Sequence, residues 1–221
     1  MFTCDVATID LTPMPLLSDH STTTDSATSL SNREQNISKH SISKHSISEQ
    51  SIAEWLIQIN DDISRELERG VNIRQLVAAR ACVIDELLIA LFKWFELDKT
   101  DLALFATGGY GRGELSLYSD VDILLLTPDE IAADNKEKID NLVALLWDIG
   151  LEPALSVRSV SECLEAALDH TVASTLLEAR LLVGNEALQD VPHRIVNTQW
   201  SPRDFYEVKI AEAKARYLQH N

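Results

Sequence analysis

Two acidic residues at the start of an apolar run are the first candidates for chemistry in this sequence. Asp120 and Asp122 flank Val121, and the run Val121–Leu126 is typical of a buried strand. Because side chains alternate along a strand, the two carboxylates are expected to share one face. Two carboxylates that lie so near each other raise each other's pKa, and one or two Mg²⁺ ions would relieve the repulsion. The pair therefore predicts a metal site, although a solvated strand end would show the same pattern.

A glycine-rich segment lies shortly before the acidic pair. Residues 108–114 hold four glycines and follow another short apolar run, Leu102–Thr107. Glycines let backbone N–H groups approach phosphate oxygens without interference from a Cβ atom, and they allow a positive φ in a tight turn. The spacing matches neither the dinucleotide-binding nor the P-loop pattern. Alone the cluster is typical of a turn, but together with the acidic pair it favours a site for metal and phosphate.

These two segments resemble the polymerase-β-like nucleotidyltransferases, whose hallmark is a GS- or GG-containing turn followed by a strand with paired Asp residues. The resemblance rests on residues 108–115 (GGYGRGEL) and 119–126 (SDVDILLL). The sequence looks closer still to the N-terminal domain of the bifunctional uridylyltransferase/uridylyl-removing enzymes, which modify the PII nitrogen-signalling protein. Three further stretches support this closer resemblance: Leu146–Glu152, Ser156–Cys163 and Leu176–Gly184.

The resemblance implies an α+β fold, with a small mixed sheet flanked by helices and helical additions at both ends. It implies Mg²⁺-dependent transfer of UMP from UTP to a tyrosine of PII in nitrogen regulation. Asp120 and Asp122 would be the catalytic, metal-binding residues, and the residues that bind the nucleotide would be Gly108, Gly109, Arg112 and Ser119. Members of the family also carry a hydrolase domain that removes UMP and ACT domains that sense glutamine. Neither fits within 221 residues, so both activities are expected to be absent.

Several assignments stay open at the level of the sequence. Arg112 would contact phosphate or form an ion pair with Glu114, and Arg158 would face either phosphate or a neighbouring carboxylate. Many nucleotidyltransferases carry a third carboxylate on a later strand, where this chain has Ser156 and Arg158. Glu152 lies just before that strand and is a weak candidate for the third acid. The alternatives to the proposed reaction are transfer to another acceptor, and a non-catalytic module that binds nucleotide or a partner.

The elements that must position these residues can be read from hydrophobic periodicity. Apolar residues recur at helical spacing around the candidate site, and short apolar runs indicate strands. We predict strands over residues 102–107, 121–126 and 153–158, and helices over 52–67, 72–95, 134–147, 159–170, 171–184 and 203–219. The last helix reaches the end of the chain without a stop signal, so residues 201–221 are predicted to begin a truncated helical segment.

Composition limits the partners. The formal net charge of −16 leaves no broad basic surface for nucleic-acid phosphates, so a polynucleotide substrate is not expected. Neither a signal peptide nor an apolar run long enough to span a membrane is present, which favours a cytoplasmic protein without membrane contact. Residues 1–50 are rich in Ser and predict a disordered tail that adds nothing to the fold, ahead of a nucleotidyltransferase domain over residues 51–200.

Overall fold

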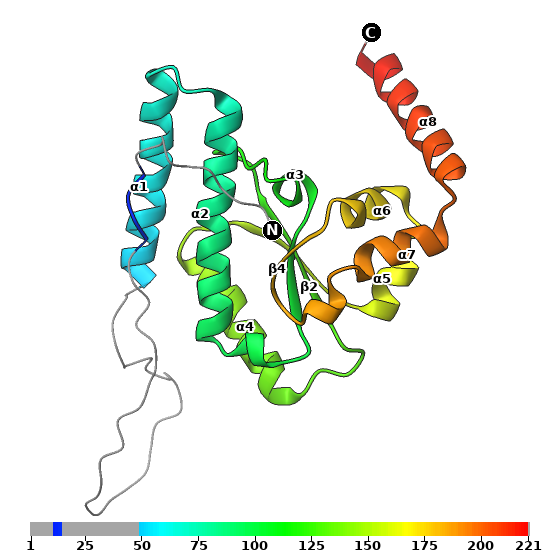
Figure 1. Ribbon diagram of the computed structural model, residues 1–221, viewed down its shortest axis with the longest axis horizontal. Coiled ribbons are helices and arrows are strands. Elements are labelled where there is room, and N and C mark those ends of the chain that lie inside the picture. Colours follow the sequence, from blue (N-terminus) through cyan, green and yellow to red (C-terminus); the bar gives the residue numbers. More distant parts are fainter. Residues whose placement is uncertain (1–10, 15–48, 221) are drawn as a thin grey trace, which may run out of the picture.

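The computed structural model describes residues 11–14 and 49–220, in which a small mixed sheet lies between two groups of helices. Figure 1 labels most of these elements. The strands are β1 (Ala103–Ala106), β2 (Val121–Thr127), β3 (Pro153–Ser159) and β4 (Arg180–Gly184). The helices are α1 (Glu49–Glu68), α2 (Ile73–Trp94), α3 (Gly108–Gly111), α4 (Ala133–Asp148), α5 (Val160–Ala166), α6 (His170–Leu177), α7 (Val191–Gln199) and α8 (Pro202–His220), with short 3-10 turns at Leu97–Lys99 and Glu186–Leu188. This α+β architecture is the one predicted.

The strand order is β3-β2-β1-β4, which puts β2 inside the sheet. β1 runs antiparallel to both β2 and β4, whereas β2 and β3 are parallel. In this register Asp122 is paired with Ala154, and the first residue of β4, Arg180, is paired with the last residue of β1, Ala106. The turn that follows β1 is therefore flanked by the start of β2 on one side and by the start of β4 on the other.

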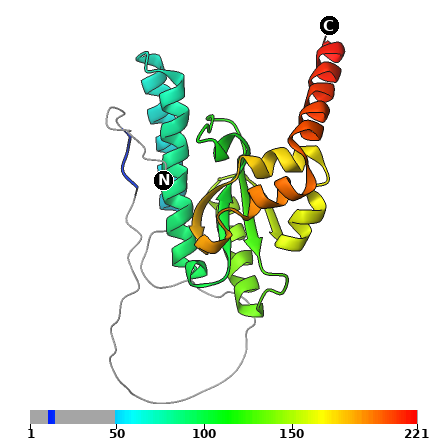
Figure 2. The ribbon, with the colours of Figure 1, turned by 45° about the vertical axis from the view of Figure 1, so that its right-hand side comes forward.

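Alternate residues of the central strands enter two separate hydrophobic cores. Val121 and Ile123 of β2 pack in one core with residues of α1, α2 and α4, while Leu124 and Leu126 pack in the other with residues of α5, α6 and α7. Figures 1 and 2 show α2 and α4 on one face of the sheet, with α1 outside α2, and the short helices α5, α6 and α7 on the other. Asp122 belongs to the second face by the same alternation.

The predicted helix over 171–184 is wrong in its second half. α6 ends at Leu177, and the next residues form β4, which pairs with β1. A Cβ atom at Gly184, where φ is +114°, would lie 2.3 Å from the backbone oxygen of Leu102, so glycine allows the two strands to meet there. A short apolar run has the same local pattern in a buried helix and in a strand. Only the pairing with β1 makes it a strand.

Residues 11–14 contradict the prediction that nothing before residue 50 takes part in the fold. The N–H and hydroxyl groups of Thr12 donate to Asp62 Oδ2 of α1 at 2.9 and 2.8 Å, and Trp55 Nε1 donates to the Thr12 carbonyl at 3.1 Å. Leu11 and Met14 pack against the first core. Burial favours a raised pKa for Asp62, but hydrogen bonds from Gln58 and Thr12 hold the pKa of that carboxyl below its ordinary value. The rest of the predicted tail, apart from residues 49 and 50 in α1, lies outside the described residues.

Replacing Thr12 with alanine is expected to lower the free energy of unfolding by about 1 kcal/mol, because a hydrogen bond to the buried Asp62 carboxylate is lost. Thermal and urea unfolding of the two proteins would measure the change. Thr198→Ala is the matched control, since the Thr198 hydroxyl donates only to Arg194 of its own helix at 2.8 Å. Equal unfolding energies for wild type and Thr12→Ala would show that this segment contributes nothing, as the sequence alone predicted.

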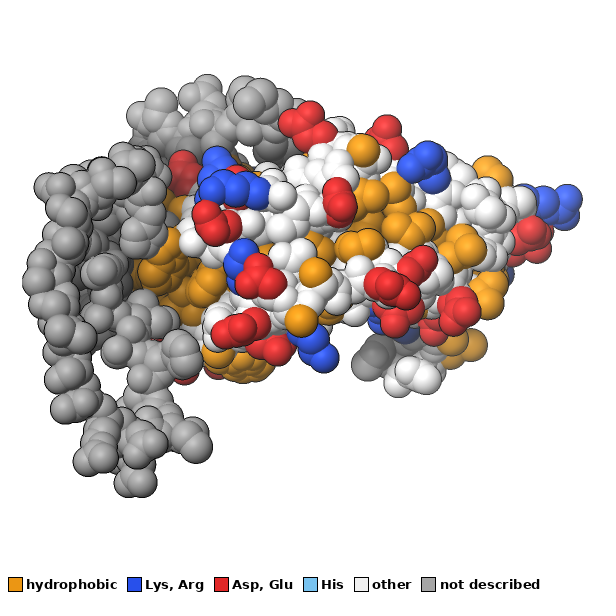
Figure 3. All heavy atoms as spheres, turned by 90° about the horizontal axis from the view of Figure 1, so that it is seen from below, with side chains coloured by type: hydrophobic (Ala, Val, Ile, Leu, Met, Phe, Trp, Pro, Cys, Tyr) orange, Lys and Arg blue, Asp and Glu red, His pale blue; other side chains and the backbone are white. Residues whose placement is uncertain are grey.

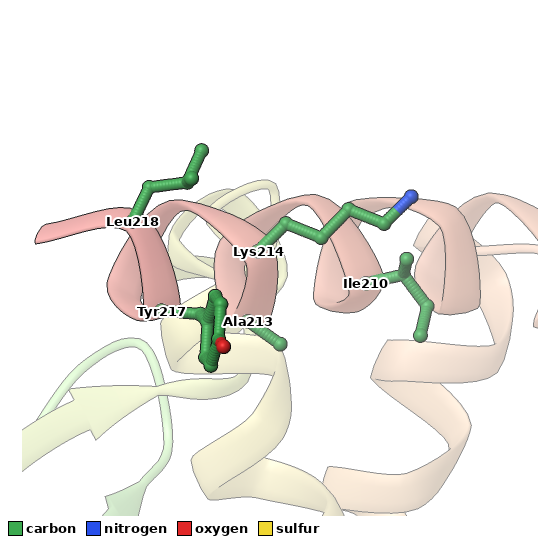
Figure 4. Close-up of a pocket in the computed structure, with 5 residues that line it drawn as sticks. All are labelled: Ile210, Ala213, Lys214, Tyr217 and Leu218. Atoms are coloured by element: carbon green, nitrogen blue, oxygen red, sulfur yellow. The ribbon is translucent and has the colours of Figure 1, made fainter. Parts of the chain in front are cut away.

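Helix α8 confirms the helix predicted over residues 203–219. It extends away from the rest of the molecule (Figures 1 and 2). Figure 4 shows the hollow on its surface, whose five lining side chains all come from α8 itself. They are Ile210, Ala213, Lys214, Tyr217 and Leu218. Ligand sites bring polar groups together from several elements. A hollow lined by one helix does not bring such groups together, so it is a weaker candidate for a ligand site than the cleft described below.

On the face shown in Figure 3, the basic side chains of the described residues are scattered among acidic ones and do not form a continuous patch. None of the helices in the described part of the chain has the length and apolar character needed to cross a bilayer.

Candidate active site

The glycine-rich turn begins where β1 ends and lies against β2. The backbone N–H of Thr107 donates to the Asp122 carbonyl at 3.0 Å, and the chain then forms the single-turn helix α3 from Gly108 to Gly111. Gly108 has φ +58°. A Cβ atom there would lie 2.8 Å from Asp122 Oδ2, so only glycine leaves the carboxylate in its present place. The backbone of Gly108 and Gly109 is partly exposed beside that carboxylate.

Asp122 is half-buried, and its surroundings disfavour the charged form. Burial raises the pKa of this carboxyl above its ordinary value of 3.8, and the negative charges of Asp120 and Glu178 raise it further. Asp120 lies just before β2 and is exposed. Its effect on Asp122 means that the two carboxylates are close enough to repel each other, as the spacing in the sequence predicts.

A cleft of about 460 Å³ runs from Asp122 along β3 and is closed by α6. Its wall is part apolar and part polar, with hydroxyl groups, one carboxylate and one guanidinium drawn from several elements. The lining residues are Thr107, Asp122, Ile123, Leu124, Pro153, Ala154, Leu155, Ser156, Arg158, Val172, Thr175 and Leu176. A concave site with a few converging polar groups is the usual form of a ligand site.

Residues 90–183 match the family described as "Nucleotidyltransferase domain". This span includes β1, the glycine-rich turn, the acidic strand β2, β3 and most of β4. Residues 90–183 form a nucleotidyltransferase domain. This match agrees with the nucleotidyltransferase class that the sequence motifs indicated.

The sequence aligns with part of longer curated relatives. The sequence is 76% identical over 221 residues to the bifunctional uridylyltransferase/uridylyl-removing enzyme of Psychrobacter arcticus, and 73% identical over 222 residues to that of Psychrobacter cryohalolentis. All of this chain and 23% of each relative are covered, so the chain spans about a quarter of the relatives' length. Among solved structures, a toxin-antitoxin crystal structure with AMP-PNP has 15% identity and a TM-score of 0.32, covering 61% of this chain and 96% of that chain.

The third strand of the nucleotidyltransferase domain carries no acid in the cleft. β3 is parallel to β2, and the β3 residues that line the cleft beside Asp122 include Ala154, Ser156 and Arg158. Glu152, the weak candidate from the sequence, is exposed and precedes the strand. Among the described residues no group of three or more His, Cys, Asp and Glu side chains is arranged to hold a metal ion.

Glu178 is the acidic neighbour that sequence reasoning missed. It follows α6 directly, and its charge contributes to the raised pKa of Asp122. The signal was present, because Glu178 belongs to the stretch 176–184 on which the family resemblance rests. Its place beside the turn depends on the unpredicted strand β4, which brings residues 178–180 back to α3. A Cβ atom on Gly111 would lie 2.0 Å from the Glu178 carbonyl oxygen, which shows how closely these segments pack.

Arg112 is held by two carboxylates. Its Nε lies 3.1 Å from Glu114 Oε2, and its Nη1 lies 2.5 Å from Glu178 Oε1. The ion pair with Glu114 that the sequence left open is therefore present. Arg158 lines the cleft and has no ion pair within 4.0 Å among the described residues. The exposed Ser119 hydroxyl donates to the Ser116 carbonyl at 2.9 Å, outside the lining of the cleft.

The raised pKa of Asp122 has a consequence for stability. An acid whose pKa is higher in the folded state binds more protons there, so the free energy of unfolding falls as pH rises from 3.8 through the folded pKa. At neutral pH Asp122 is charged, and its unfavourable surroundings lower the free energy of unfolding by their full amount. In chelator, Asp122→Asn is therefore expected to melt higher than wild type at neutral pH, and the two proteins should converge well below pH 3.8.

Melting midpoints of both proteins across this pH range would measure the difference. Asp140→Asn, at an exposed position of α4, is the control for loss of one negative charge from the surface. If Asp122→Asn melted lower than wild type at neutral pH, the carboxylate would be stabilising the fold, and the repulsion described above would be excluded.

Proposed function

We propose that this nucleotidyltransferase domain transfers UMP from UTP to a tyrosine hydroxyl of a PII signalling protein. One observation carries the proposal: the Gly108 backbone, kept free of a Cβ atom, lies against the Asp122 carboxylate in the wall of a cleft. A triphosphate at the turn would have its phosphates beside the acidic pair. The relatives are named as uridylyltransferases, which supports UTP as the donor.

The residues present fit a magnesium ion. Mg²⁺ prefers oxygen ligands and is commonly bound by one or two carboxylates together with substrate phosphates and water. Asp120 and Asp122 provide two carboxylates, and the raised pKa of Asp122 indicates a place where a cation is favoured. When bound there, Mg²⁺ would neutralise the charge that develops on the α-phosphate and on the pyrophosphate leaving group.

The side chains and backbone of this chain would orient the reactants. The N–H groups of Gly108 and Gly109 would donate to the triphosphate, and Ser119 would exchange its bond to Ser116 for one to phosphate. Arg112 would reach phosphate after releasing Glu114 or Glu178. The tyrosine oxygen of PII attacks the α-phosphorus in line, the bond to the β-phosphate oxygen breaks, and pyrophosphate leaves as the hydroxyl proton is lost. The Asp122 carboxylate is a candidate acceptor for that proton.

A second candidate function has one observation in its favour. Because β3 has Ala154, Ser156 and Arg158 in the cleft, this strand lacks the third acid that many nucleotidyltransferases carry on a later strand. A module that binds nucleotide without transferring it would need no third acid. Transfer of another nucleotide, or to another acceptor, would use the same turn and acidic pair. We also place the reaction in the cytoplasm, as expected from the sequence.

One assay separates these functions. The purified chain is incubated with Mg²⁺, PII protein and each of the four nucleoside triphosphates in turn, and pyrophosphate release and the mass of PII are measured. Of the four nucleotides, we expect only UTP to give pyrophosphate and a uridylyl adduct of PII. We expect neither product with a PII variant whose acceptor tyrosine is replaced by phenylalanine. Pyrophosphate with a different nucleotide would favour another transferase. Mg²⁺-dependent binding without pyrophosphate would favour the non-catalytic module.

A further inference from the structure

The glycine-rich turn is held from behind by a charged pair that the proposed reaction does not use. Arg180, at the start of β4, donates through Nη1 to Asp85 Oδ2 of α2 at 2.7 Å and through Nη2 to Asp85 Oδ1 at 3.1 Å. Both side chains are largely buried, at 21% and 18% exposure. A bidentate pair of this kind fixes the plane and the position of the guanidinium group.

The same guanidinium donates to the turn itself. Arg180 Nε lies 3.2 Å from the Gly111 carbonyl oxygen, and Nη2 lies 3.3 Å from the Tyr110 carbonyl oxygen. These two carbonyls belong to the end of α3, where a helix leaves its last acceptors without intrahelical partners. The Tyr110 carbonyl also accepts from Gly113 N at 2.9 Å. With a single turn, α3 has little stability of its own, so contacts from neighbouring elements determine its position.

Tyr110 completes the attachment. Its hydroxyl donates to Asp85 Oδ1 at 2.6 Å, its side chain is 1% exposed, and the Arg180 guanidinium lies 5.7 Å from the centre of its ring. Burial raises the pKa of Tyr110 well above its ordinary value, and the Asp85 charge adds to this. The phenol therefore stays neutral and remains a hydrogen-bond donor. The sequence left a packing role and a base-stacking role open for this tyrosine, and its burial favours packing.

We propose that Asp85 and Arg180 are positioning residues that hold the Gly108–Gly111 turn at the distance from Asp122 required for binding a triphosphate. Backbone hydrogen bonds link the anchored end of the turn to its phosphate-facing end, since Gly111 N donates to the Thr107 carbonyl at 2.8 Å and Arg112 N to the Gly108 carbonyl at 3.3 Å. A shift of the Arg180 end would therefore move Gly108 and Gly109. This inference rests on the proposed function, because it assumes that the turn contacts the β- and γ-phosphates.

Arg180→Lys tests the proposal, because lysine keeps the charge but cannot bond at once to Asp85 and to both carbonyls. Dissociation constants for UTP and for UMP are measured with Mg²⁺, well below the melting temperature. UMP lacks the two phosphates that the turn would contact. We expect the dissociation constant for UTP to rise about tenfold while that for UMP is unchanged. A merely structural role of Arg180 would weaken both nucleotides together.

Two further variants make the result decisive. Tyr110→Phe removes only the hydrogen bond to Asp85 and keeps the buried ring. We expect it to weaken UTP binding by less than Arg180→Lys does and to leave UMP binding unchanged. It therefore provides the test if Arg180→Lys fails to fold. Ile195→Ala, in α7 of the second core, lowers stability without touching the turn and should leave both dissociation constants unchanged. Equal losses of affinity for UTP and UMP would overturn the positioning role. So would unchanged UTP affinity in both Arg180→Lys and Tyr110→Phe. If wild type bound neither nucleotide, the proposed function would fail first.

Discussion

Asp122→Asn is expected to reduce nucleotidyl transfer on the order of a thousandfold, because a bound metal stabilises the transition state by several kcal/mol and each 1.4 kcal/mol is worth about tenfold in rate. Asparagine keeps the shape of the side chain but removes a charge and a strong metal ligand. The fold should persist, since the Asp122 side chain makes no hydrogen bond to another of the described residues and its burial disfavours the charge.

The measurement is the rate of UMP transfer to PII under saturating UTP and Mg²⁺. Asp140→Asn, at an exposed site on α4, controls for the loss of one negative charge and should keep the wild-type rate. Circular dichroism of each protein would establish that the fold is intact. Transfer by Asp122→Asn at a rate close to that of wild type would mean that the reaction takes place elsewhere in the molecule.

Gly108→Ala is expected to have the second largest effect, a loss of transfer on the order of a hundredfold, the usual result of displacing a reacting group by about 1 Å. The new methyl group would lie 2.8 Å from Asp122 Oδ2, closer than such atoms approach, so the carboxylate must move. The obstructing atom belongs to a side chain rather than to the backbone. The fold should therefore survive at a cost of about 1–2 kcal/mol for the left-handed conformation.

Gly70→Ala is a matched control for that conformational cost. Gly70 has φ +86°, and a Cβ atom there would meet nothing within 4 Å. Both variants should lose a similar amount of stability, but only Gly108→Ala should lose transfer. If the two substitutions had the same effect on the transfer rate, the contact between the turn and Asp122 would have no part in the reaction.

The sequence predicted the centre of this site because its signals there are local. Strand alternation placed Val121 and Ile123 on the opposite face from Asp122, and the structure has them in the first core. The composition of residues 108–114 predicted a turn with positive φ, which is present at Gly108. These features depend on neighbouring residues, so periodicity and residue type were enough to find them.

The parts that sequence reasoning missed depend on contacts between distant residues. β4 is a strand because it pairs with β1, and a short apolar run gives no local sign of that pairing. With β4 unrecognised, neither the approach of Glu178 to Asp122 nor the bond from Arg180 to Asp85 could be anticipated. The contact of Thr12 with Asp62 joins residues 50 positions apart, and the Ser-rich composition around it suggested no such contact.

The most direct test of the account is a titration of UTP against wild type and Asp122→Asn, each with Mg²⁺ and with chelator. A triphosphate carries about four negative charges, and two carboxylates at its site would repel it unless a divalent cation lies between them. We predict tight binding only for wild type with Mg²⁺, and weak binding in the other three conditions. Equal UTP affinity in all four conditions would contradict the assignment of Asp120 and Asp122 as the metal-binding pair of a nucleotidyltransferase site.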